Sequence, residues 1–178
     1  MAKAEILLTS EDYVKSFTNI SDNLSGKYLL SAIREAQDID LCGILGECLL
    51  AKLKALYGAG ELAGDYKMLV DKAQPFLAYT TCVYCIDRTS YKITNFGLAR
   101  SSDENLQLAT MDEMQAEKGF YQAKADAQCW DLTGWLLENR QLFPELDACG
   151  CSRRRANLTS SYSGGIVLGG PRGKIIRR

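Results

Sequence analysis

Apolar residues recur every three to five positions over two long stretches of this chain, with charged and amide side chains between them. The first stretch runs from Leu29 to Leu56 and the second from about Leu106 to Arg140. Because an α-helix completes a turn in 3.6 residues, this spacing gathers the apolar side chains on one helical face. We therefore predict amphipathic helices over both stretches, and we expect the first to be interrupted once, near Asp38–Cys42.

Capping signals and further apolar spacing predict two more helical segments. A hydroxyl residue before two acidic ones, either Thr9 or Ser10, is a suitable N-cap for a short helix over Glu11–Phe17. Another helix is predicted over about residues 61–86, in which Pro75 should produce a kink or begin a new helix. The residues that we expect to be largely buried in the resulting bundle are Leu29, Ile33, Leu45, Leu49, Leu53, Val83, Tyr121, Leu132 and Leu136.

The stretch 89–102, with the sequence TSYKITNFGLARSS, is the one clear interruption of the helical pattern. Its apolar residues around Asn95 and Gly97 favour a short strand, a turn or a hairpin over a helix. We therefore predict an all-α fold, a helical bundle with one short β-hairpin or loop insertion that protrudes at about Ser90–Ser102. If this insertion faces a neighbouring subunit, the candidate contact residues are Tyr91, Ile93, Phe96 and Gly97.

Charge divides the chain into two unlike parts. All 22 Asp and Glu lie in residues 1–149 with 14 of the Lys and Arg, so this part has a net charge near −8. Residues 150–178 contain seven basic residues, no acidic ones and many Ser and Gly. Such a segment cannot bury enough apolar surface to fold alone, so we expect it to order only on an acidic partner. Its candidate contact residues are Arg153, Arg154, Arg155, Ile166, Val167, Leu168, Arg172, Lys174, Arg177 and Arg178.

This division predicts one α-helical domain, residues 1–149, followed by a basic, extended C-terminal arm, residues 150–178. The first part is long enough for one hydrophobic core but hardly for two. The acidic partner of the arm could be the body of a neighbouring subunit, another protein or nucleic acid. No apolar run approaches the about 18 residues that cross a bilayer, so we expect a soluble, intracellular protein without membrane contact.

No motif in the chain supports catalysis, cofactor binding or a metal site. There is no His, the side chain best suited to proton transfer near neutral pH and the commonest metal ligand. The Gly-rich stretch before Lys174 lacks two residues that a phosphate-binding loop requires. Two cysteine pairs, around 82–85 and 149–151, could together hold zinc, but seven scattered cysteines favour buried, reduced thiols. We therefore predict no catalytic residue, cofactor or metal, and neither a zinc site nor disulfides.

The order of these features resembles the small head-to-tail connector proteins (adaptor or head-completion proteins) of tailed bacteriophages. The resemblance covers about residues 5–145. It is carried by the opening LLTSEDYVKSF, the helices ending in LLAKLKALYG, the island YKITNFGLARS, the long helix after it and the non-globular C-terminus. It implies a mostly α-helical subunit that forms a ring of about a dozen copies at the phage neck. It also implies contacts with the portal protein and other neck or tail proteins, and a channel that passes DNA without sequence specificity.

We thus expect a structural virion protein, made and assembled in the host cytoplasm, and not an enzyme. An acidic body would keep DNA from adhering to the channel, and the basic arm would bind the acidic flank of the next protein. The alternative is a nucleic-acid-binding protein whose arm contacts phosphates and whose affinity falls steeply with salt. Because Trp130 and Trp135 are five residues apart and cannot both face one core, at least one is expected to line an interface.

Overall fold

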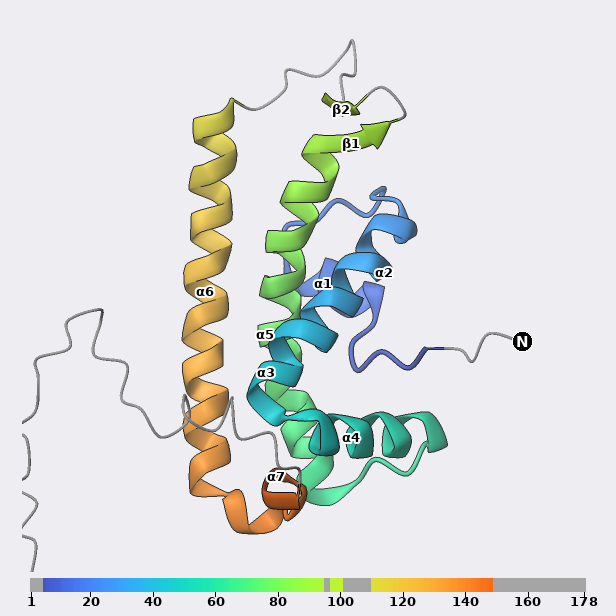
Figure 1. Cartoon of the computed structure of the whole chain (residues 1–178), viewed down its shortest axis with the longest axis vertical. Helices are drawn as coiled ribbons and strands as arrows, with labels where there is room; N and C mark the ends of the chain where they lie inside the picture. Colours follow the sequence, from blue (N-terminus) through green and yellow to red (C-terminus); the bar gives the residue numbers. More distant parts are fainter. Residues whose placement is uncertain (1–4, 95–96, 101–109, 149–178) are drawn as a thin grey trace, which may run out of the picture.

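The computed structural model describes residues 5–94, 97–100 and 110–148, most of which are helical (Figure 1). The expectation of a mostly helical, all-α fold is confirmed. In chain order the elements are α1 (Glu11–Phe17), α2 (Gly26–Glu35), a π-helical segment (Ala36–Leu41), α3 (Cys42–Leu45), α4 (Glu47–Ala59), α5 (Gly64–Ser90), β1 (Tyr91–Thr94), β2 (Gly97–Arg100), α6 (Met111–Glu138), a 3₁₀ turn (Arg140–Leu142) and α7 (Glu145–Ala148).

Helix α5 is the centre of the bundle. Helices α1 and α2 and the π-helical segment pack against it, and α6 lies along it over much of its length (Figure 1). Helix α4 contacts α7 at the end of the bundle where α6 finishes. The fold is therefore one bundle in which α6 is the outermost long helix on its side.

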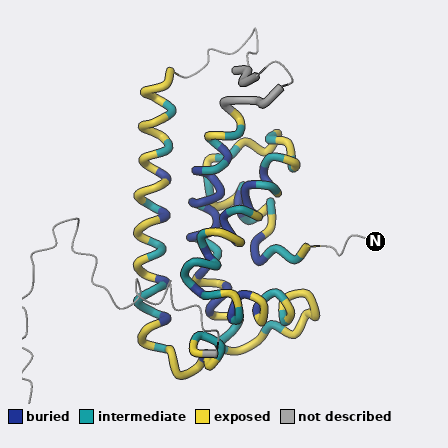
Figure 2. Tube along the Cα trace, in the orientation of Figure 1, coloured by how far each residue is buried: buried dark blue, intermediate teal, exposed yellow. Residues whose placement is uncertain are grey.

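The hydrophobic core follows the predicted apolar stripes closely. All nine side chains that were predicted to be buried are 7% exposed or less. The main cluster joins Leu41, Leu45, Leu49 and Leu53 to residues of α5 and to Leu132 and Leu136 of α6. Figure 2 shows buried positions concentrated on α5 and on the sides of the surrounding helices that face it.

The interruption predicted near Asp38–Cys42 is wrong, because the chain stays helical there as the π-helical segment and α3. The break falls instead at Gly46, which ends α3 and begins α4 with a φ of +80°. Only glycine adopts that conformation without a steric penalty. Of the two outcomes expected at Pro75, a new helix does not occur, since α5 runs through this residue as one helix.

The sequence predicted that the second long helix begins at about Leu106. In the structure, α6 begins at Met111. Thr110 is the N-cap: its hydroxyl accepts from the N–H of Glu113 at 3.3 Å. The Glu113 carboxylate in turn accepts from the N–H of Thr110 at 2.8 Å. This reciprocal pair satisfies two backbone donors and fixes the first turn of α6. The rest of the predicted N-terminal extension lies outside the described residues.

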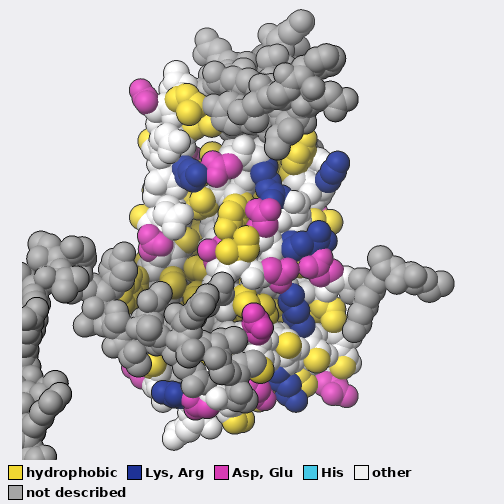
Figure 3. Space-filling model, viewed as in Figure 1, with side chains coloured by type: hydrophobic (Ala, Val, Ile, Leu, Met, Phe, Trp, Pro, Cys, Tyr) yellow, Lys and Arg dark blue, Asp and Glu magenta, His cyan; other side chains and the backbone are white. Residues whose placement is uncertain are grey.

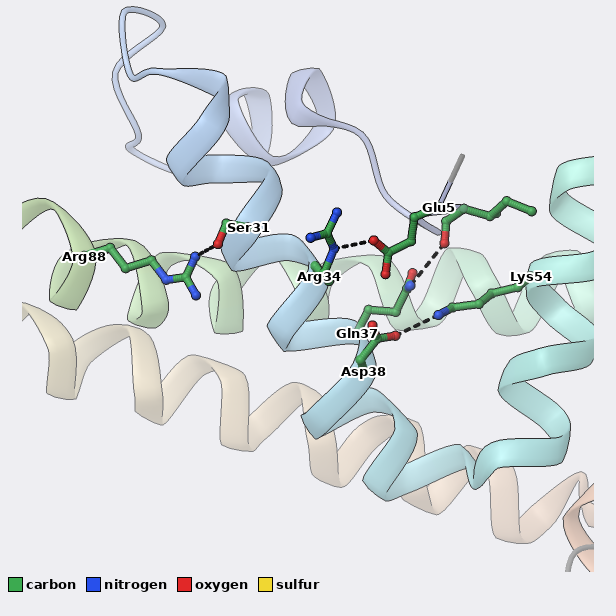
Figure 4. Close-up of polar contacts among 8 residues, drawn as sticks. Glu5, Ser31, Arg34, Gln37, Asp38, Lys54 and Arg88 are labelled. Atoms are coloured by element: carbon green, nitrogen blue, oxygen red, sulfur yellow. Dashed lines mark hydrogen bonds and ion pairs between the residues drawn. The ribbon is translucent and has the colours of Figure 1, made fainter. Parts of the chain in front are cut away.

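The N-terminal segment is held against the π-helical segment by polar contacts (Figure 4). The side chain of Gln37 is fully buried and accepts from the N–H of Leu8 at 2.8 Å. Its amide group donates to the carbonyl of Ile6 at 3.2 Å. In the same segment, Asp38 accepts from Lys54 of α4 at 2.7 Å. The π-helical segment is thus bonded on one side to the N-terminus and on the other to α4.

The two strands pair antiparallel, with Tyr91 opposite Arg100 and Ile93 opposite Leu98. β1 follows α5 directly, and both strands lie at the end of the bundle away from α4 and α7 (Figure 1). The non-helical stretch begins later than the predicted residue 89 because α5 continues to Ser90. Residues 95–96, between the strands, are outside the described part of the chain.

Candidate functional site

The predicted contact residues are only partly within the described chain. Tyr91 and Ile93 lie on β1 and Gly97 lies on β2. Phe96 and every candidate of the C-terminal arm, residues 153–178, lie outside it. Of the two tryptophans, Trp130 is 64% exposed on α6, whereas Trp135 is half-buried with its ring 5.8 Å from that of Phe143. The exposed tryptophan is therefore on α6.

Helix α6 carries apolar residues on two opposite faces. Its inner face, with Tyr121, Ala125, Leu132 and Leu136, is buried against the bundle. The other face carries a set that we call the outer seam: Ala116, Phe120, Ala123, Ala127, Trp130, Gly134 and Leu137. The inner and outer sets lie about half a turn apart around the helix axis, because one turn of an α-helix takes 3.6 residues. A helix that only covers a core has one apolar face. The outer seam therefore indicates that α6 packs against a second partner in addition to its own bundle.

The outer seam is exposed and regularly spaced. Phe120, Trp130 and Leu137 are 51%, 64% and 47% exposed. The seven residues follow one another at alternating intervals of four and three, which is the spacing of a helix that packs along another helix. Sequence reasoning singled out Trp130 but missed the seam, because the inner stripe alone already explained α6 as amphipathic.

Small residues make the outer seam accessible to another helix. Four of its seven positions are Ala or Gly, and a Cβ added at Gly134 would meet no atom within 4 Å. Distances between packed helices depend on the side chains at the contact, so such positions permit a close approach. Lys124 flanks the seam, with its Nζ 4.1 Å from the centre of the Phe120 ring. Figure 3 shows acidic and basic side chains interspersed over the visible face of the bundle.

A cavity of about 350 Å³ lies between α5, α6 and the π-helical segment. Its walls include the apolar side chains of Ile44, Phe76 and Val83. Three of its four charged side chains are acidic, Asp40, Asp87 and Asp126, and the fourth is Lys118; Thr80, Tyr84 and Gln122 are uncharged polar residues of the lining. We call this space the acidic cavity. Sequence reasoning missed it, because its acidic residues come from three separate elements.

Hydrogen bonds hold the acidic side chains of this cavity in place. The Tyr84 hydroxyl donates to Oδ2 of Asp40 at 2.9 Å. Lys118 donates to both oxygens of Asp87, at 2.9 and 2.7 Å. On the rim, the Gln122 amide donates to Oδ1 of Asp126 at 3.0 Å. The cavity is therefore bounded by carboxylates that already have fixed orientations.

Burial raises the pKa values of two groups in the acidic cavity. It raises the pKa of the Asp40 carboxyl above its usual range, and nearby Glu35 adds to the effect while the Tyr84 hydrogen bond opposes it. Burial, with the hydrogen bond to Asp40, raises the pKa of Tyr84 to about 12. Tyr84 thus remains a proton donor near neutral pH and cannot serve as a base there.

The prediction that the cysteines form no disulfide is wrong, because Cys48 is disulfide-bonded. Cys48 lies in the first turn of α4, which packs against α7, an element that sequence spacing alone does not place beside it. The described cysteines outside disulfides are Cys42, Cys82, Cys85 and Cys129. Cys149 and Cys151 lie outside the described residues. No group of three His, Cys, Asp or Glu positioned for a metal ion occurs within the described ranges.

Residues 41–156 match a family of unknown function, DUF6712. The chain belongs to this family. The match includes α3 to α7, and hence the whole outer seam and most of the residues around the acidic cavity. No curated protein and no solved structure matches the chain. Among the helices that the structure describes, none combines the length and the apolar character needed to cross a membrane.

Proposed function

We propose that this protein is a structural subunit of a bacteriophage neck, which assembles into a closed ring between portal and tail and passes DNA through its channel. The observation that carries the proposal is the outer seam of α6. Exposed aromatic and aliphatic side chains at helical-packing spacing favour a protein partner over solvent. The resemblance to phage connector proteins supplies the place of assembly.

The unlike charges of the two parts of the chain permit head-to-tail contacts between copies. Residues 1–149 carry a net charge near −8, and the arm carries seven positive charges. Contacts between an acidic body and a basic arm join two different surfaces, and such head-to-tail contacts close into rings when the rotation permits. In a two-fold dimer the same arm-to-body contact would occur twice, so the resemblance to connector proteins, and not the charge, selects the ring.

Within this assembly we assign different tasks to the parts of the subunit. The outer seam packs against the next subunit, and the hairpin and the extended arm reach adjoining subunits or the portal and tail proteins. The net acidic body repels DNA phosphates, so that duplex DNA moves through the channel without adhering. This proposal requires no catalytic residue and no cofactor.

The mass of the full-length protein in solution tests the proposal. Native mass spectrometry or light scattering should show a closed species of many copies of the 19.7 kDa chain, visible as a ring by electron microscopy. Trp130→Glu and Phe120→Glu should shift the population to smaller species because they place charge in the apolar interface. Gln115→Glu, an exposed position of α6 outside the seam, is the matched control and should still assemble.

A chain that stays a monomer at every concentration would rule out the ring. So would normal assembly of both seam variants, because the seam would then have no part in it. Salt-sensitive binding of duplex DNA by a monomer would instead favour the nucleic-acid-binding alternative.

A further inference from the structure

We infer that helix α2 of a neighbouring copy packs antiparallel on the outer seam of α6, with its Leu30 over Gly134. The inference deepens the ring proposed above and rests on it, because it names the helix of the next subunit that the seam receives. Helix α2 has ten residues and is therefore about 15 Å long, so it covers the part of the seam from Trp130 to Leu137.

Charge argues against a second α6 as the partner of the outer seam. Helix α6 contains six acidic residues and two lysines, so its net charge is −4. Two such helices side by side would bring like charges together along the interface, which is unfavourable. The seam therefore favours a helix that presents basic side chains beside an apolar one.

Helix α2 has such a surface. Lys27, Leu30 and Arg34 are exposed, and their spacing of three and four residues places them on one face of the helix. Leu30 is 42% exposed, and Lys27 forms no ion pair with another described residue. Arg34 pairs with Glu5 through Nε (Figure 4), but its side chain is 54% exposed and can also face a second carboxylate. This face of α2 thus carries a leucine between two cations.

The outer seam offers the matching pattern with opposite charges. Asp131, Gly134 and Glu138 follow one another at the same intervals of three and four residues. Within the described part of the chain, neither acid forms an ion pair, and both are exposed. A Cβ added at Gly134 would meet no atom within 4 Å, so the space between Trp130 and Leu137 can receive a leucine side chain.

The side on which the charges lie sets the direction of the pair. Around the helix axis, the cations of α2 lie about 40 to 60° from Leu30, and the acids of α6 lie at the same angles and in the same sense from Gly134. When two helices face each other, such borders meet on the same side only if the helices run antiparallel. Lys27 then lies opposite Glu138, and the second cation of α2 lies opposite Asp131.

The ends of the two helices favour the same arrangement. Lys27 lies in the first turn of α2, which contains no acidic residue, and Glu138 is the last residue of α6, whose last turn contains no basic residue. Each charge is therefore at the helix end that carries a partial charge of its own sign, which is unfavourable. The antiparallel pair places these two opposite charges next to each other, so each compensates the other.

The two helices of one subunit do not form this pair by themselves. Both α2 and α6 pack against α5, which lies between them (Figure 1). A contact between α2 and the outer seam therefore joins two copies. Because the two surfaces are different, each subunit can offer α2 to one neighbour and its seam to the other.

A charge exchange in the full-length protein tests the inference. Glu138→Lys would place two cations opposite each other, and Lys27→Glu two acids, so each variant alone should associate several-fold more weakly, with a smaller defect at high salt. The double variant with both changes should recover the association, as measured by analytical ultracentrifugation. The matched control combines Glu138→Lys with Lys52→Glu, an exposed lysine of α4, and should stay weak although its net charge is the same.

The same measurements separate this inference from the ring itself. Suppose that the protein assembles and that Trp130→Glu prevents assembly. If the Lys27 and Glu138 variants then associate normally, if the double variant fails to recover, or if the control recovers equally, α2 is not the helix on the seam, and the ring stands. If the unchanged protein is monomeric at every concentration, both proposals fall.

Discussion

The backbone of Leu8 is bonded at both of its polar groups to side chains far along the sequence: its N–H donates to Gln37 at 2.8 Å, and its carbonyl accepts from Gln74 of α5 at 3.2 Å. Leu8 itself is fully buried. A single residue of the N-terminal segment, Leu8, therefore connects the π-helical segment to the central helix α5. The register of the N-terminal segment depends on two side-chain amides, that of the buried Gln37 and that of the half-buried Gln74.

Replacing Gln37 with Leu should lower the free energy of unfolding by about 1 to 3 kcal/mol, because the buried N–H of Leu8 loses its acceptor. Urea denaturation followed by circular dichroism measures this change. Gln141→Leu, at an exposed position after α6, is the control and should change stability by no more than about 0.5 kcal/mol. Equal effects of the two changes would mean that the Gln37 bonds do not hold the segment.

Replacing Gly134 with Ala should separate subunit stability from assembly. The added methyl group meets open space and removes the helix penalty of glycine, so the separated subunit should gain up to about 1 kcal/mol. In a seam packed against another helix the same methyl group should instead weaken association. Gln115→Ala is the control, since Gln115 is also exposed on α6 but lies outside the seam. Association that is unaffected, or equally weakened in both, would contradict close packing at Gly134.

Stability should fall as the pH rises from about 9 to 12. Burial raises the pKa of Cys82 from 9.0 to about 11 and that of Cys85 to about 12. In this pH window the unfolded chain has lost thiol protons that the folded chain retains. Unfolding therefore releases protons, and a higher pH favours it. Below pH 9 the stabilisation by these thiols is fully present. Unfolding midpoints measured at pH 8 and pH 11 test the sign. Cys85→Ala should flatten the decline, and a constant midpoint in the unchanged protein would show that these thiols ionise equally in both states.

The disulfide at Cys48 should be visible in the thiol count. Denatured, unreduced protein should expose five thiols of seven cysteines, and reduction should expose all seven. Peptide mapping should identify the cysteine joined to Cys48, which is expected to be none of Cys42, Cys82, Cys85 and Cys129, because these four are free thiols. Seven thiols before reduction would show that the bond does not form in the isolated protein.

Most of the fold follows from local sequence, since the helical stripes that predicted the core lie on α2, α4, α5 and α6. The errors arose where one signal competed with another. Polar residues near Asp38–Cys42 suggested a break, but buried contacts of Gln37 and the Asp38–Lys54 pair keep that stretch helical. Only the positive φ of Gly46 ends it.

The candidate site was much harder to predict. The spacing of the outer seam is present in the sequence, yet the inner stripe with Tyr121, Leu132 and Leu136 already accounted for α6, so its second apolar face was not predicted. The acidic cavity brings together Asp40, Thr80 and Asp126 from three elements, and that meeting is a product of packing.

Because α6 presents apolar side chains on both faces, an isolated subunit holds this helix from one side only. Binding of a second copy stabilises only the folded state, so folding and association are linked by mass action. The melting temperature of the protein should therefore rise with its concentration, even though each subunit has a complete core of its own. Dilution would then loosen α6 before it unfolds the rest of the bundle.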